Sequence, residues 1–77
     1  MNTQKPYLQA IRANLTALRA ILLTVLKDVD HGANAAGQGN QNGAAGAIIP
    51  VEEQLRQAAI LVQAILVLHR QRLRRQP

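Results

Sequence analysis

The fold is decided by residues 8–29, which read LQAIRANLTALRAILLTVLKDV. Large apolar residues recur in this stretch at alternating spacings of three and four: Leu8, Ile11, Leu15, Leu18, Leu22, Val25 and Val29. Such a heptad pattern places one continuous apolar stripe along one side of a single α-helix. A stripe of this length has to be buried, so the pattern predicts a coiled-coil-like helix that packs against a partner.

A second helix is predicted near the C-terminus. Pro50 suits the first position of a helix, and Glu52 and Glu53 complement the positive end of the helix dipole. The helix carries an apolar stripe and further aliphatic residues around most of its circumference, namely Leu55, Ala58, Ile60, Leu61, Val62, Ile65, Leu66, Val67 and Leu68. A helix that is apolar on most sides is normally surrounded by other helices.

The segment between these helices holds all five glycines of the chain among Asn, Gln and Ala. It offers too little apolar surface to offset the entropy of ordering it, and about twenty residues is long for a structured loop. We therefore expect a helix over about 4–29, a flexible linker over 30–49 and a helix over about 50–74, within a single domain spanning 1–77.

The predicted fold class is an all-α, antiparallel two-helix hairpin. Pairing Val29 with Val51 would bring Lys27 opposite Glu53 and Asp28 near Arg56. One hairpin partner covers only one side of each helix, so several large aliphatic side chains would stay exposed in a monomer. Each contributes about 1.5–3 kcal/mol when buried. We therefore expect the hairpin to complete a helical bundle by oligomerisation or by docking to partners.

The sequence thus has more apolar side chains than one hairpin can bury. This excess predicts a small α-helical structural or assembly subunit whose aliphatic faces mediate protein–protein interaction. The partner would be a second copy of the chain or the subunits of a larger complex. The predicted interface residues are Leu8, Ile11, Leu15, Leu18, Leu22, Val25, Leu55, Val62, Ile65 and Leu68.

An alternative hypothesis is a nucleic-acid-binding accessory protein, because the net charge is +5 and basic residues gather where the termini would meet. The candidate contacts to an anionic partner are Lys5, Arg12, Arg70, Arg72, Arg74 and Arg75. Tyr7 is the only aromatic residue, which disfavours single-strand binding platforms and membrane-surface anchoring. The longest nearly unbroken apolar run, residues 58–68, is about half of what spans a bilayer, so a membrane role is not expected.

Catalysis is not expected, and neither is a cofactor or a metal. The chain has no cysteine, and no hydroxyl side chain has an evident base and orienting acid beside it. His31 and His69 would fall at opposite ends of the hairpin. Asp28 and Asp30 begin like a calcium loop but lack its glycine and its terminal glutamate. Without an unbroken apolar signal segment, the expected location is intracellular and soluble.

Overall fold

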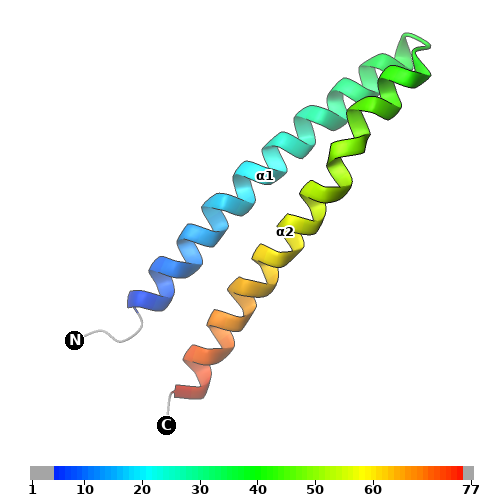
Figure 1. Cartoon of the computed structure of the whole chain (residues 1–77). Coiled ribbons are helices and arrows are strands. Elements are labelled where there is room, and N and C mark those ends of the chain that lie inside the picture. Colours follow the sequence, from blue (N-terminus) through cyan, green and yellow to red (C-terminus); the bar gives the residue numbers. More distant parts are fainter. Residues whose placement is uncertain (1–4, 76–77) are drawn as a thin grey trace.

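The computed structural model describes the backbone of residues 5–75 and the side chains of residues 5–71. This part of the chain consists of two long α-helices, α1 over Lys5–Gly37 and α2 over Gln41–Arg75. The helices run antiparallel and are joined at one end by a short turn (Figure 1). The predicted all-α hairpin is confirmed.

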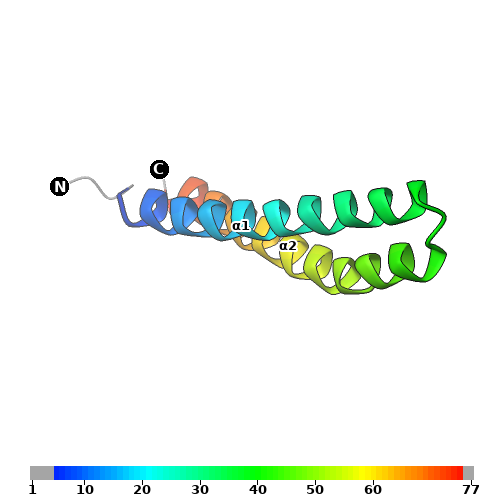
Figure 2. The same cartoon turned by 90° about the horizontal axis from the view of Figure 1, so that it is seen from above.

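The hairpin is a long, thin rod. It measures 60 × 16 × 13 Å and has a radius of gyration of 17.7 Å, whereas a compact domain of this length would have about 11.5 Å. The two helices wrap around each other, since they overlap near the turn in Figure 1 and near the open end in Figure 2. A rod of two helices has little interior in which to hide apolar side chains.

The segment 30–49, predicted to be a flexible linker, is helical over most of its length, so that prediction was wrong. α1 continues to Gly37 and α2 begins at Gln41, which leaves only residues 38–40 between the helices. Gly32 shows why: a Cβ added there would lie 3.4 Å from the Ala44 carbonyl oxygen and 3.6 Å from the Ala47 Cβ. Small residues let the two backbones come close, and the contacts they make offset the entropy of ordering the segment.

The turn is built from two consecutive helix caps. Gly39 has a φ of +76°, the left-handed conformation that commonly ends helices. The Asn40 N–H donates to the Ala35 carbonyl at 2.8 Å, and the Gly39 N–H donates at 3.0 Å to the carbonyl of the next residue, Ala36. This pair of bonds is the Schellman motif. Asn40 then caps α2, because its Oδ1 accepts a hydrogen bond from the Gly43 N–H at 2.8 Å.

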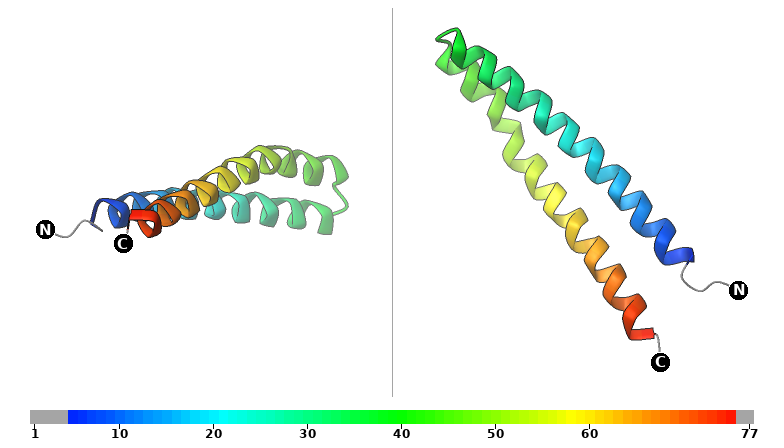
Figure 3. Two further views of the ribbon diagram at one scale, coloured as in Figure 1. Left: turned by 90° about the horizontal axis from the view of Figure 1, so that it is seen from below. Right: turned by 180° about the vertical axis from the view of Figure 1, so that it is seen from behind.

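α2 passes through Pro50, which was predicted to be its first residue. Proline has no N–H, so the carbonyl of Gly46 loses its usual donor within the helix. Gly46 is exposed, which leaves its carbonyl accessible to water. α2 bows in the segment around residue 50 (Figure 3), as expected for a proline inside a helix.

The two helices pack along a heptad seam, which we define as the buried and half-buried residues that follow one another at alternating steps of three and four. On α1 the seam consists of Tyr7, Ile11, Asn14, Leu18, Ile21, Val25, Asp28, Gly32 and Ala35. On α2 it consists of Ala44, Ala47, Val51, Gln54, Ala58, Leu61, Ile65 and Leu68. The alternating steps of three and four continue on both helices through segment 30–49, where the seam residues are small.

The interior of the hairpin is very small. Among the described residues the buried apolar side chains are Val51, 7% exposed, and Ala58, 6% exposed, and no large side chain is fully buried. The expected proximity of Asp28 and Arg56 is replaced by other contacts. The carboxylate of Asp28 accepts a hydrogen bond from Gln54, and Arg56 forms ion pairs with Glu52 and Glu53 of its own helix.

Candidate protein interface

A second apolar stripe lies beside the seam on α1. The residues that directly follow seam positions include large aliphatic side chains that remain 41–56% exposed. They are Leu8, Leu15, Leu22, Leu26 and Val29. One residue corresponds to about 100° around a helix, so α1 carries two stripes on adjacent sides, of which α2 covers one.

α2 has the same construction. The residues that follow its seam positions again include exposed aliphatic side chains, namely Ile48, Leu55, Val62 and Leu66, which are 42–49% exposed. The offset from the seam has the same size and direction along the sequence as on α1. Each helix therefore has one covered and one uncovered apolar stripe.

The two uncovered stripes lie on the same side of the hairpin. A hollow on the other side is lined by Ala20 and Thr24 of α1 and Gln57 of α2, and each of these residues directly precedes a seam position. Positions that precede the seam thus share one side of the rod, and positions that follow it share the opposite side. We call the latter the apolar face: Leu8, Leu15, Leu22, Leu26, Val29, Ile48, Leu55, Val62 and Leu66.

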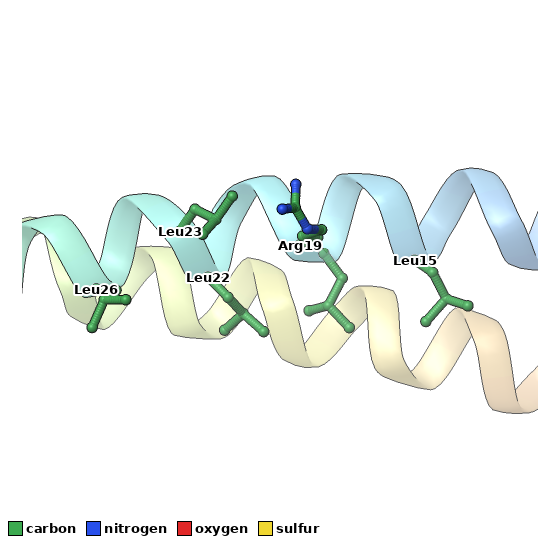
Figure 4. A pocket seen from close by; sticks show the side chains of 6 residues that line it. Leu15, Arg19, Leu22, Leu23 and Leu26 are labelled. Atoms are coloured by element: carbon green, nitrogen blue, oxygen red, sulfur yellow. The ribbon is translucent and has the colours of Figure 1, made fainter.

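The apolar face contains a shallow hollow of about 380 Å³ along α1, lined by Leu15, Leu18, Arg19, Leu22, Leu23 and Leu26. Figure 4 shows Leu15, Leu22 and Leu26 projecting across α2, whereas the guanidinium of Arg19 turns away from them. The aliphatic stem of Arg19 can cover apolar surface while its charge stays in water. The lining suits an aliphatic partner better than a polar ligand.

The opposite side of the rod is different in character. On α1 it presents small and polar side chains, including Ala17, Ala20 and Thr24. On α2 it presents Gln57 together with Ile60, which is 59% exposed. The rod thus has one side with two aliphatic stripes and another with scattered apolar residues, and such asymmetry is typical of a binding surface.

The predicted interface residues divide between the two surfaces. The structure places Ile11, Leu18, Val25, Ile65 and Leu68 in the seam, where they pack the two helices together. It places the other predicted members on the apolar face: Leu8, Leu15, Leu22, Leu55 and Val62. The predicted interface lacks four members of the apolar face, although the same one-residue offset from the seam identifies them: Leu26, Val29, Ile48 and Leu66.

The charged residues do not gather at the turn. The acidic residues Asp28, Asp30, Glu52 and Glu53 lie 9–14 residues from Gly39, because the turn is tighter than predicted. The basic candidates Lys5, Arg12 and Arg70 are exposed on the open half of the rod. The side chains of three further candidates, Arg72, Arg74 and Arg75, lie outside the described residues.

The histidine and acidic residues of the described part of the chain are spread along the rod. They contain no group of three His, Asp or Glu residues that could hold a metal ion. His31 lies toward the turn and His69 toward the open end, and both are exposed. By length and mean hydropathy α1 could cross a membrane, although Arg12 and Arg19 interrupt its uncovered stripe and charged side chains at bilayer depth are costly.

The apolar face is built from side chains that folding of the single hairpin leaves in water. Comparison of the chain with models of protein families, with curated proteins and with solved structures finds no match.

Proposed function

We propose that the chain is a small α-helical assembly subunit that associates with a protein partner through its apolar face. The observation that carries the proposal is the pair of uncovered stripes on one side of the rod, with Leu8, Leu15 and Leu22 each 45–56% exposed. Exposed aliphatic surface of this extent and order marks an interaction site in a soluble protein.

The accessible surface supports the same proposal. The chain exposes 6012 Å² for a mass of 8.4 kDa, whereas a compact monomer of this mass exposes about 4,600 Å². The excess, roughly 1,400 Å² on one chain, is larger than the about 800 Å² that each partner buries in a standard interface. Burial of apolar area contributes about 25 cal/mol per Å², so covering a large part of this excess area would give a large favourable hydrophobic contribution to the free energy of association.

The test compares the apolar face with the opposite side of the rod. Leu22→Gln with Val62→Gln places two polar side chains in the uncovered stripes, and Ile60→Gln with Val67→Gln is the matched control. Both control residues are at least 45% exposed, and each directly precedes a seam position. The readout is the size of the complex that contains the chain, measured by gel filtration of an extract from cells that make it.

We expect the unsubstituted chain and the control variant to elute in the same large complex, and the face variant to elute much later. Circular dichroism of the purified variants should show similar helix content, since all four side chains lie outside the seam. Equal elution of the two variants would contradict the proposal. So would recovery of the unsubstituted chain only in the membrane fraction, because that result would assign the apolar surface to lipid.

A further inference from the structure

We propose that the partner on the apolar face is a second copy of this chain, packed face to face with its turn at the opposite end, to give a four-helix bundle. This inference rests on the proposed function and specifies its partner. It is carried by the angle between the stripes, by the area available and by the distribution of charge.

The angle between the stripes fits a four-helix bundle. In a bundle of four roughly parallel or antiparallel helices, each helix contacts two neighbours on adjacent sides, about 90° apart. On both α1 and α2 the uncovered stripe follows the seam by one residue, which corresponds to about 100°. Two hairpins that meet through their apolar faces would therefore satisfy both stripes of all four helices.

The area is sufficient for a stable dimer. On α1 the apolar face runs from Leu8 to Val29, about 32 Å along the helix axis. With the 16 Å width of the rod, this face has roughly 500 Å² per copy, or about 1,000 Å² in a face-to-face dimer, which is the lower limit for a specific interface. Two separate copies expose about 12,000 Å², whereas a compact protein of their combined mass exposes about 7,700 Å². The interface would then bury between about 1,000 and 4,300 Å² in total, from the lower limit of specific interfaces to the size of obligate homodimers.

Symmetry allows two arrangements of the hairpins. In one, both turns lie at the same end of the bundle, and α1 packs against α2 of the second copy. In the other, the turns lie at opposite ends, and α1 packs against α1. The first arrangement would bring the basic open ends of both copies together, including Lys5, Arg12 and Arg70 of each, and like charges at close range repel.

The second arrangement brings opposite charges together. When the uncovered stripes on α1 of the two copies are aligned end to end, Leu8 of one copy lies beside Val29 of the other. The level of Asp28 and Asp30 then falls between Lys5 and Arg12 of the second copy. On α2, Glu52 and Glu53 fall at the level of Arg70 of the second copy. The acidic residues of each copy thus lie at the level of basic residues of the other copy, and this charge complementarity selects the opposite-end arrangement.

The alignment predicts which residues approach one another. The uncovered stripe on α1 is centred between Leu8 and Val29. Arg19 of one chain therefore lies close to the two-fold axis, beside Arg19 of the other chain. Leu8 of one chain would lie roughly 32 Å along the helix axis from Leu8 of the other. Because the sequence contains no cysteine, single substitutions report these distances directly through disulfide formation, which requires Cα atoms within about 7 Å.

The experiment uses the purified full chain with one cysteine at a time, oxidised and analysed on non-reducing gels. Arg19→Cys should form a disulfide-linked dimer at least tenfold faster than Thr24→Cys, which lies on the opposite side of the same helix. Leu8→Cys alone should remain at the rate of the Thr24→Cys control. A mixture of Leu8→Cys and Val29→Cys chains should cross-link, because these positions are adjacent in the opposite-end dimer.

Three results would overturn the inference. Preferential cross-linking of Arg19→Cys with Ala59→Cys, rather than with itself, would show that the turns share one end. Equal rates for Arg19→Cys and Thr24→Cys would show that the apolar face is not the contact. A monomer in sedimentation equilibrium at high concentration would exclude the second copy. If the complex in extracts still depended on Leu22 and Val62 in that case, the proposed function would stand with a different partner.

Discussion

The side-chain amide of Gln54 donates a hydrogen bond to the carboxylate of Asp28, with Nε2 3.3 Å from Oδ2, and so joins α2 to α1 inside the seam. Both residues are half-buried. A polar contact in a largely aliphatic seam fixes the register of the helices, because a shift along the axis would place the carboxylate against apolar side chains.

Replacing Gln54 with Leu should lower the free energy of unfolding by about 1–2 kcal/mol, since the half-buried carboxylate of Asp28 loses its donor. The double variant Asp28→Leu, Gln54→Leu should recover this loss, because both polar groups then leave the seam. Urea denaturation at one fixed protein concentration measures both effects, and Gln57→Leu, at an exposed position, is the control. A single variant as stable as the parent would show that the hydrogen bond contributes nothing.

Replacing Gly39 with Ala should destabilise the hairpin by about 1–2 kcal/mol, because an L-residue is strained at a φ of +76°. The same substitution at Gly46 is the control. A Cβ there meets nothing within 4 Å, so Gly46→Ala should stabilise the helix by about 0.5–1 kcal/mol. Thermal melting followed by circular dichroism should move the two midpoints in opposite directions, and a rise for both would contradict the turn described above.

Gly32 should tolerate a methyl group but not a larger side chain. A Cβ at this position would make ordinary contacts at 3.4–3.6 Å with α2, and alanine is the better helix former. We expect Gly32→Ala to be neutral or stabilising and Gly32→Leu to destabilise by about 1–3 kcal/mol, because the helices would be forced apart. Equal stability of the two variants in urea denaturation would mean that the helices do not approach closely here.

Replacing Arg19 with Leu should tighten self-association by about tenfold, equivalent to about 1.4 kcal/mol. The substitution completes the uncovered stripe and removes two like charges from beside the two-fold axis. Lys27→Leu removes the same charge from the opposite side of α1 and should leave the dissociation constant nearly unchanged. Sedimentation equilibrium over a concentration series measures both constants, and weaker association of Arg19→Leu would argue against this contact.

The sequence allowed the hairpin and the shortage of partners for its helices to be predicted, but not which apolar residues the sister helix covers. The predicted stripe on residues 8–29 combines members of two adjacent stripes. Ile11, Leu18 and Val25 belong to the seam, and Leu15 and Leu22 belong to the apolar face. Apolar periodicity cannot separate them, because the seam is completed by Asn14 and Asp28, whose polar side chains hide the pattern.

The connection between the helices was misjudged for a different reason. A segment rich in glycine and asparagine favours disorder, but Gly39 and Asn40 have the residue types and the order of a helix end followed by a helix start. The seam also continues through Gly32 and Ala35 into Ala44 and Ala47, residues too small to register as an apolar stripe. Close backbone packing through small side chains is visible only when both helices are placed together.

The tight reversal at Gly39 also has a kinetic consequence. Residues that touch across the hairpin are separated in sequence by a distance that grows steadily from the turn to the tips, so closing each layer adds only a small loop to the one already closed. Such a chain can fold from the turn toward the open end, and each pair of helical turns that has formed nucleates the next. The order of closing also fixes the order of opening: amide hydrogens beside the turn should exchange last, and those at the far tips first.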